Sequence, residues 1–197
     1  MGERARVFID YWNFQLNWNE RAEDARCDWV SLPRALIRSV ERVLDGVELS
    51  HEGTLIYASV DPANENLLGW LETFLSRQTG FVVRIARLLR RQRAVRCASC
   101  GCETEACPEC GEPLTVTTTK GLATQMVVDM MSLCNGGGCD VPILVSSDTE
   151  LAPAVRYLVD RGVKVVHAGW RDVGGELTRE AWASVELDPL IGELVRS

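Results

Sequence analysis

Two short apolar segments each lead to a carboxylate, and these acids are the clearest chemical signal in the chain. Residues 141–145 (Val-Pro-Ile-Leu-Val) are followed closely by Asp148, and residues 6–9 are followed directly by Asp10. Such segments have the composition of buried parallel strands, which deliver the next residues to the carboxyl edge of a sheet. Ligands of open α/β sheets bind at that edge. Asp10 and Asp148 are therefore candidate ligands for a hard divalent cation such as Mg²⁺ or Mn²⁺.

The two acids become neighbours if the strand that ends at Asp10 is central and the strand order reverses beside it. Two further residues follow Asp10 closely. Asn13 could orient a substrate or a metal ligand, or it could be an ordinary turn or cap residue. Trp12 could stack on a base, or it could simply pack against its neighbours.

Ser147 and Glu150 have the spacing of a capping box, which is a purely structural alternative. Pro153 argues against it. A helix capped at Ser147 would place this proline, which lacks an N–H, beyond the free donors of the first turn. We expect the helix to begin near Glu150 or Leu151, which leaves residues 146–149 as a loop. Asp148 and Glu150 then face whatever binds at the sheet edge.

A third acid lies on the apolar face of a helix predicted over residues 122–134. Successive positions at ~100° place Asp129 on that face. The face also carries Leu122, Met126, Met130 and Leu133. An unpaired carboxylate there costs free energy, so it needs a cation, a cluster of donors or a wet cleft. A salt bridge with Lys120 or an arginine is one interpretation. We favour a site acid, because a metal compensates several buried carboxylates.

Two Cys-x-x-Cys-Gly turns supply four thiolates with the spacing of a structural zinc site. The four cysteines are Cys97, Cys100, Cys107 and Cys110. The glycine after each turn tolerates the backbone twist of a chelating knuckle. The spacer 101–106 is shorter than usual, and Cys102 could compete as a ligand. We predict a structural Zn²⁺ in a knuckle inserted at residues 97–110, with no open coordination position for catalysis.

An arginine-rich stretch leads into this knuckle from a strand predicted at residues 81–86. A charge run of this kind is usually a solvated face. Guanidinium groups, however, make bidentate contacts with phosphates, so we predict that the stretch binds nucleic acid. The arginines concerned are Arg87, Arg90, Arg91, Arg93 and Arg96, after Arg84 within the strand. The β-branched segment 114–119 is expected to return from the knuckle as an extended arm.

The rest of the chain alternates helical and strand patterns, which indicates an α/β fold. Helices are predicted over residues 31–44, 66–77 and 151–160, and strands over residues 53–60 and 163–168. The residues of the second helix expected to face the sheet are Leu67, Leu68, Leu71, Phe74 and Leu75. In the last strand, His167 is either packed or functional.

Composition narrows the class of protein. A chain of 197 residues with 46% hydrophobic content suffices for one α/β domain with a small insertion. The net charge of −7 excludes a generally basic surface, so any contact with nucleic acid must come from a local patch. Neither a membrane span nor a signal peptide is evident, and we expect a cytoplasmic protein. Eight cysteines in such a protein favour metal binding over disulfides.

With these residues in view, the chain resembles the NYN-domain family, a branch of the PIN-like metal-dependent ribonucleases. The resemblance spans most of residues 6–170. It rests on Phe8-Ile-Asp10-x-x-Asn13, on Lys120-Gly121 before the helix with Asp129, on Leu144-Val-Ser-Ser-Asp148-x-Glu150 before a helix with an early proline, and on Arg161-Gly162-Val-Lys-Val166. Two positions depart from the family pattern, which usually has Gly and Asp where this chain has Ser147 and Glu150.

The resemblance implies an α/β/α sandwich with a mainly parallel sheet and Mg²⁺- or Mn²⁺-dependent hydrolysis of RNA. In this interpretation Asp10, Asp129 and Asp148 hold the cation, Asn13 orients a substrate or ligand, and Glu150 serves in the outer shell. Lys120 or the arginine-rich stretch would hold the RNA backbone. The sequence leaves open RNA or DNA as substrate, and a monomer or a homodimer.

Two other functions remain open. A binding module could keep the fold without the chemistry and grip RNA or a protein with the knuckle and the arginine-rich stretch, and Glu150 is its best support. A small-molecule phosphohydrolase could use Asp10 as a nucleophile. The segment Asp10-Tyr11-Trp12, however, lacks the second carboxylate that such enzymes usually carry two residues later.

Overall fold

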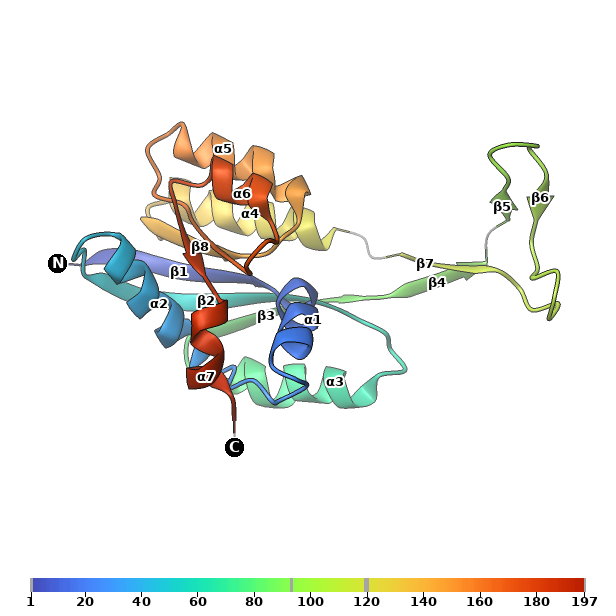
Figure 1. Ribbon diagram of the computed structural model, residues 1–197, viewed down its shortest axis with the longest axis horizontal. Coiled ribbons are helices and arrows are strands. Elements are labelled where there is room, and N and C mark those ends of the chain that lie inside the picture. Colours follow the sequence, from blue (N-terminus) through green and yellow to red (C-terminus); the bar gives the residue numbers. More distant parts are fainter. Residues whose placement is uncertain (1, 93, 119–120, 197) are drawn as a thin grey trace.

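A six-stranded parallel sheet forms the centre of the protein, in the order β10-β9-β8-β1-β2-β3 (Figure 1). The computed structural model describes residues 2–92, 94–118 and 121–196. The strands of the sheet are β1 (Glu3–Asp10), β2 (Leu49–Val60), β3 (Phe81–Arg87), β8 (Val141–Val145), β9 (Val166–Gly169) and β10 (Ala183–Glu186). The predicted α/β fold with a mainly parallel sheet is confirmed.

The strand order reverses at β1. The chain proceeds from β1 outward through β2 and β3, and it later proceeds from β8 outward through β9 and β10 on the other side. The carboxyl ends of β1 and β8 are therefore adjacent at a topological switch point. Ile9 pairs with Val145 in the register of these two strands, so the residues that follow them leave the sheet at the same level.

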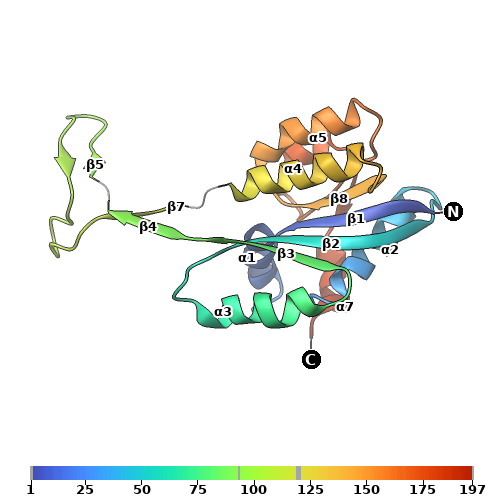
Figure 2. The same ribbon diagram turned by 180° about the vertical axis from the view of Figure 1, so that it is seen from behind.

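Helices cover both faces of the sheet and complete three layers, as Figures 1 and 2 show from opposite sides. One face carries α1 (Tyr11–Arg21), α2 (Leu32–Val43), α3 (Glu65–Gly69) and α7 (Ile191–Leu194). The other face carries α4 (Leu122–Asn135), α5 (Ala152–Val159) and α6 (Gly175–Glu180). A separate hydrophobic core lies between the sheet and the helices on each face. The strands contribute alternate residues to the two cores, so Ile9 lies in the first and Phe8 in the second.

The covering helices follow from apolar residues at helical spacing. Helix α2 buries Leu32, Leu36 and Val40, and Pro33 occupies its first turn, where no N–H is required. Helix α4 buries Met126 and Met130, as its sequence predicts. Helices α1 and α6 are not evident from the sequence, since the first buries only Tyr11, Phe14 and Trp18 and the second only Leu177.

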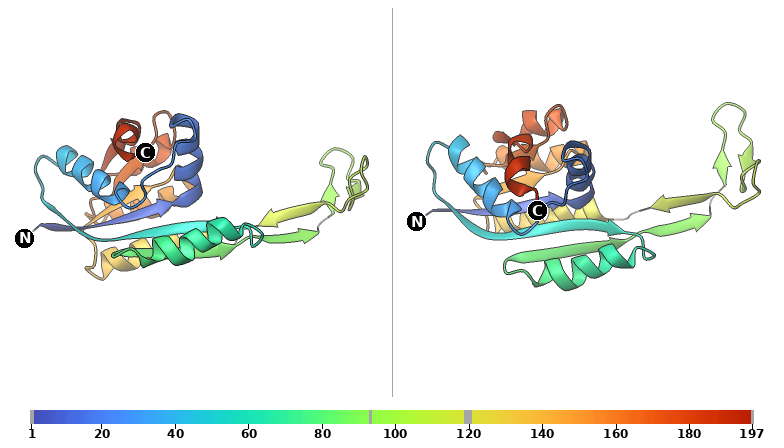
Figure 3. Two further views of the ribbon diagram at one scale, coloured as in Figure 1. Left: turned by 90° about the horizontal axis from the view of Figure 1, so that it is seen from below. Right: turned by 60° about the horizontal axis from the view of Figure 1, so that its bottom comes forward.

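A two-stranded arm projects from the α/β body in Figures 1 and 3. Strand β4 (Leu89–Gln92) pairs antiparallel with β7 (Thr115–Thr118), and the short strands β5 (Val95–Arg96) and β6 (Glu103–Thr104) pair beyond it. The extended return predicted for residues 114–119 is confirmed for residues 115–118. The cysteine-rich segment is thus carried at the distal end of the arm.

Three helical segments replace the single helix predicted over residues 66–77. Helix α3 ends at Gly69, the π-helix η1 covers Trp70–Phe74, and the 3₁₀ turn η2 covers Leu75–Arg77. The wider π turn changes the direction of the residues along it. Leu71 is buried as expected, whereas Phe74 is 37% exposed. The expectation that Phe74 packs toward the sheet is therefore wrong.

No helix within the described ranges is long and apolar enough to cross a membrane.

Candidate active site at the switch point

Asp10 and Asp148 lie together at the carboxyl edge of the sheet. Asp10 is the last residue of β1, and Asp148 follows β8 across the switch point. Both line a small pocket of about 30 Å³, whose other walls include Tyr57 of β2 and Met126 of α4. The structure thus brings together two of the three acids that the sequence singles out.

The Asp10 carboxylate is held by hydrogen bonds from two neighbours. The Asn13 side-chain amide donates at 2.6 Å, the Asn13 backbone N–H at 3.3 Å, and the Ser146 hydroxyl at 3.3 Å. Burial raises the pKa of Asp10, and Asp148 adds to this, although the hydrogen bonds lower the pKa. A cation bound beside Asp10 would favour its ionised form and offset the cost of burial.

Asn13 connects the two sides of the switch point. Its amide group donates to Asp10, and its carbonyl oxygen accepts from the backbone N–H of Ser147 at 3.2 Å. Donor and acceptor on one side chain are needed for this double contact, which a carboxylate could not make. Asn13 therefore fixes the loop after β8 relative to the end of β1.

Asp148 begins the turn that follows β8. Its carboxylate accepts from the Glu150 N–H at 2.9 Å and caps the 3₁₀ turn η3 (Thr149–Leu151), which leads into α5. The Asp148 N–H donates to the Ser146 hydroxyl at 3.1 Å. Ser147 does not cap the helix, so the prediction that the helix begins near Glu150 is confirmed. Glu150 itself is exposed on the turn.

Asp129 is surrounded by donors on the α4 side of the sheet. Its carboxylate accepts from the Tyr57 hydroxyl at 3.0 Å, from the Arg84 guanidinium at 3.2 Å and from the Gln125 amide at 2.7 Å. Its side chain is 13% exposed. A salt bridge with an arginine, one of the two interpretations of this acid, is therefore present. Asp129 does not line the pocket of Asp10, but its hydrogen-bond partner Tyr57 does.

Tyr57 and Arg84 are residues of the site that sequence patterns miss. Tyr57 lies inside a buried apolar strand, and Arg84 is by sequence the first arginine of the stretch that leads into the arm. Their approach to Asp129 depends on the lateral register of three strands, which no local pattern encodes.

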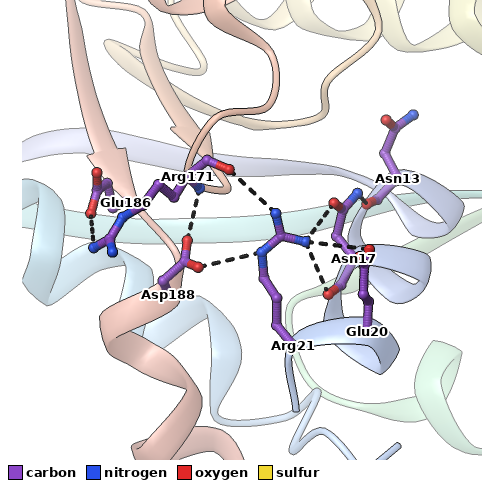
Figure 4. A network of polar contacts seen from close by, with 7 residues as sticks. All are labelled: Asn13, Asn17, Glu20, Arg21, Arg171, Glu186 and Asp188. Atoms are coloured by element: carbon purple, nitrogen blue, oxygen red, sulfur yellow. Dashed lines mark hydrogen bonds and ion pairs between the residues drawn. The ribbon is translucent and has the colours of Figure 1, made fainter. Parts of the chain in front are cut away.

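Arg21 anchors the helix that carries Asn13, as Figure 4 shows. It donates to the Asn17 side chain at 2.9 Å and to the Arg171 carbonyl at 3.3 Å, and it forms an ion pair with Asp188 at 3.3 Å. The Asn17 side-chain amide in turn donates to the Asn13 backbone carbonyl at 2.8 Å. Helix α1 is thereby tied to the segments that follow β9 and β10, which restrains Asn13.

Two backbone turns with the same hydrogen bond carry the four predicted zinc ligands. The Gly101 N–H donates to the Cys97 carbonyl at 2.9 Å, and the Gly111 N–H donates to the Cys107 carbonyl at 2.9 Å. Both glycines have a left-handed backbone conformation, with φ of 74° and 73°. In each turn, backbone N–H groups of the following residues donate to the first thiol and lower its pKa.

Cys102 occupies a different position from the other four cysteines of the knuckle. Its carbonyl accepts from the Cys97 N–H at 2.8 Å, just as the Glu112 carbonyl accepts from the Cys107 N–H at 2.8 Å. Cys102 is thus the counterpart of Glu112 in the repeated turn. This repeat favours Cys97, Cys100, Cys107 and Cys110 as the matched set of four.

The predicted nucleic-acid contacts lie on several elements. Arg87 ends β3 and is exposed, and Arg96 is exposed and donates to the Gly101 carbonyl at 3.4 Å. The Trp12 indole N–H donates to the Ser59 carbonyl, 2.5 Å away, at the end of β2. Of the remaining candidates, Arg90 and Arg91 belong to strand β4, while Arg93 and Lys120 lie outside the described residues.

No three acidic, histidine or cysteine side chains are grouped as a metal site in the part of the chain that the structure describes. The Asp10–Asp148 pair and the two cysteine pairs are therefore the candidate sites that the geometry offers.

The fold and this site define an α/β protein whose acidic pocket lies at the switch point of a parallel sheet. Residues 4–188 match the family model of the NYN domain. The chain therefore belongs to the NYN-domain family, which is a PIN-like nuclease family whose members generally use divalent metals.

A solved structure with a similar fold is a protein of unknown function from Vibrio parahaemolyticus. It shares 17% sequence identity with this chain and a TM-score of 0.55, and the match covers 94% of this chain and 93% of the other. At this identity the likeness concerns the fold alone. No curated protein matches the sequence significantly.

Proposed function

We propose that this protein is a metal-dependent ribonuclease that hydrolyses phosphodiester bonds in RNA. The observation that carries the proposal is the meeting of Asp10 and Asp148 in one pocket at the switch point of an NYN-family fold. Asp10 ends β1 and Asp148 follows β8, and both are half-buried. Burial raises the pKa of Asp10, so the pair costs free energy unless a ligand compensates it.

The pair fits a hard divalent cation. Mg²⁺ is commonly held by one or two carboxylates, with water and substrate phosphates completing its coordination, rather than by a cage of protein ligands. Asp10 and Asp148 would supply these two carboxylates. When bound, the cation supplies neutralisation of charge on the phosphate and activation of the attacking water.

The neighbouring residues have positioning roles in this proposal. Asn13 holds Asp10 and the loop after β8 in place through its two hydrogen bonds. Asp129 is the third acid of the site, oriented by Tyr57 and Arg84. Glu150, exposed on the turn after Asp148, would act through the water shell of the cation.

The arm would hold the RNA at a distance from the acids. Cys97, Cys100, Cys107 and Cys110 would supply the four thiolates of a structural zinc ion, two from each of the repeated turns. The two turns would have to approach each other to close this site, because no three ligands are grouped among the described residues. Phosphates of the RNA would be contacted by Arg87, Arg90, Arg91, Arg93, Arg96 and Lys120.

The test is a cleavage assay on labelled single-stranded RNA and DNA, with Mg²⁺, with Mn²⁺ and with a chelator. We expect the wild type to cleave RNA only with metal, and Asp148→Asn to lose activity about 100-fold or more. Asp45→Asn is the matched control. Asp45 is exposed in the loop before β2 at the opposite edge of the sheet, and its left-handed φ of 48° also suits asparagine. Equal rates for wild type and Asp148→Asn would refute the proposal.

One observation favours a second candidate function, an RNA-binding module without catalysis. Both carboxylate oxygens of Asp129 accept hydrogen bonds from protein donors, including the cationic Arg84. This candidate predicts binding of RNA that weakens with salt, and no turnover with either metal.

A further inference from the structure

A groove lined by aromatic rings lies on the opposite face of the sheet from the acidic pocket. It runs between α1 and the segment formed by α3 and η1, which lie side by side in Figures 1 and 2. Its volume is about 1200 Å³, above the roughly 300–1,000 Å³ of pockets for single drug-sized ligands. Its aromatic residues are Tyr11, Trp12, Trp29, Trp70 and Phe74.

The aromatic rings form one continuous cluster. Trp29 stacks on Tyr11 with ring centroids 5.2 Å apart, and it meets Trp70 edge-on at 6.0 Å. Trp70 stacks on Phe74 at 6.2 Å. Tyr11 and Trp29 are buried at the base, whereas Trp70 is half-buried and Phe74 is exposed at the rim. The rings that the groove exposes are therefore those of Trp70 and Phe74, and the buried rings beneath hold them in place.

The wall of the groove contains the π-helix η1. The Leu75 N–H donates to the carbonyls of both Leu71 and Trp70, so the turn is one residue wider than in an α-helix. π turns are rare and occur frequently at functional sites. In this chain the π turn brings Trp70 and Phe74 to the groove while Leu71 remains in the core.

Two arginines, whose backbones are hydrogen-bonded to each other, line the groove. The Arg196 N–H donates to the Arg26 carbonyl at 2.8 Å, and both residues are exposed. Neither side chain has an ion pair within 4 Å in the part of the chain that the structure describes. The groove also contains Asp28, but its carboxylate accepts hydrogen bonds from Ser31 and from the Val30 N–H and caps the turn before α2. The positive charge of Arg196 also lies near Asp28, where it helps to lower the pKa of that carboxyl. The Arg26 guanidinium is therefore the group most available to an anionic ligand, and Arg196 is shared with Asp28.

The groove and the acidic pocket share no lining residue, but residues of the two are consecutive in the chain. Tyr11 and Trp12 directly follow Asp10, and Trp12 is fixed at the end of β2 by its hydrogen bond to Ser59. An extended ligand chain that runs from the acids over the first turn of α1 would therefore contact Trp12 first and the remaining rings next.

We propose that this groove binds two or three successive bases of single-stranded RNA, next to the phosphate that lies at Asp10 and Asp148. The inference rests on the proposed ribonuclease function. The ring faces would stack on the bases, and Arg26 and Arg196 would contact the phosphates. The groove exceeds the size of a single-ligand pocket, and its lining carries two arginines against one acid, Asp28.

The first test is the affinity of a fluorescent 12-nucleotide single-stranded RNA, measured by anisotropy with a chelator present so that no cleavage occurs. We expect Phe74→Ala to weaken binding roughly 5- to 100-fold, the range for loss of one stacking partner, and Trp70→Ala to do likewise. The matched control is Trp182→Ala, because Trp182 is 52% exposed and lies outside the groove. It should change affinity less than twofold.

Trp70 packs against other rings, so its removal could disturb the fold. Arg26→Gln provides a second variant at an exposed position, and it should weaken binding and reduce its dependence on salt. Ultraviolet cross-linking of RNA to the wild-type protein provides a measurement without mutation, and the cross-linked peptides should include residues 70–74.

The proposal is overturned if Phe74→Ala and Arg26→Gln bind RNA as tightly as Trp182→Ala, or if the cross-links fall only on other elements. A partner protein in the groove would give that result. Failure of the proposed ribonuclease function is a separate result, namely no metal-dependent cleavage by the wild type. The binding and cross-linking measurements do not depend on cleavage.

Discussion

The hydroxyl of Tyr57 donates a hydrogen bond of 3.0 Å to the carboxylate of Asp129. Tyr57 pairs with Asp10 in the register of β1 and β2, and it pairs with Arg84 in the register of β2 and β3. Asp10, Tyr57 and Arg84 therefore form a lateral row across three strands at the carboxyl edge. Helix α4 places Asp129 over the row, so the third acid is connected to the first through a tyrosine side chain.

Replacing Tyr57 with phenylalanine removes one donor from Asp129 and leaves the ring in place. The free energy of unfolding should fall by about 1.5–3 kcal/mol, the usual contribution of a hydrogen bond to a charged group. Urea unfolding measures this change. Tyr157→Phe is the matched control, because Tyr157 lies at the surface against Arg161 and its hydroxyl makes no hydrogen bond to a described residue. Equal losses in the two variants would contradict the role assigned to Tyr57.

Binding of Mg²⁺ or Mn²⁺ should stabilise the protein through Asp10 and Asp148. A ligand that binds only the folded state raises its stability, and a concentration about tenfold above the Kd should raise Tm by roughly 3–6 °C. Asp10→Asn and Asp148→Asn should abolish this increase, whereas Asp45→Asn should retain it. Thermal unfolding with and without metal measures the effect. An undiminished increase in Asp148→Asn would place the cation elsewhere.

The adjacency of Asp10 and Asp148 could be predicted from the sequence because it depends on strong local signals. Each acid follows a short buried strand, and the alternation of strands and helices makes a parallel sheet with a switch point the expected topology. The turn after Asp148 was equally predictable, because Pro153 cannot lie deep in a helix. These features depend on the order of elements rather than on how far one strand slides past another.

The environment of Asp129 and the aromatic groove could not be predicted in this way. Arg84 belongs to an arginine-rich stretch by sequence, yet strand register places it beside Asp129. Trp29 and Trp70 are far apart in the chain and meet only through the packing of helices on one face. The π turn at Trp70–Phe74 also escapes local patterns, because its sequence is compatible with an ordinary helix.

His167 should make the stability of the protein depend on pH. Its Nε2 lies 2.8 Å from the Ser146 carbonyl, which can only accept, so Nε2 carries the proton and Nδ1 accepts from the Thr178 hydroxyl at 2.9 Å. Burial lowers the pKa of His167 below its ordinary value of about 6.5. Its contribution to stability is therefore complete above pH ~6.5, and it is lost as the pH falls from there toward the lower pKa of the folded state.

The measurement is the free energy of unfolding between pH 7 and pH 5. It should decrease toward pH 5 in the wild type, by at most about 1.4 kcal/mol per pH unit for one group. His167→Gln should reduce this slope. The pKa of His51, the other histidine of the chain, is also lowered by burial, but a hydrogen bond with the Gly53 backbone opposes this and the residue is exposed. His51→Gln should therefore reduce the slope less. The opposite ranking of the two variants would show that His167 is not the group responsible.

The repeated turns of the arm predict which thiols bind zinc. Purified protein should contain about one zinc ion per chain, and Cys100→Ser should lose it because a site of four thiolates is then incomplete. Cys102→Ser is the matched control, since Cys102 occupies the position of Glu112 in the repeat and should leave the zinc in place. Elemental analysis of reduced protein measures the content. If Cys102→Ser loses zinc and Cys100→Ser keeps it, the correspondence between the two turns does not determine the ligands. Both variants should retain the Tm increase with Mg²⁺, because the acids lie in the α/β body and the cysteines lie beyond β4 and β7.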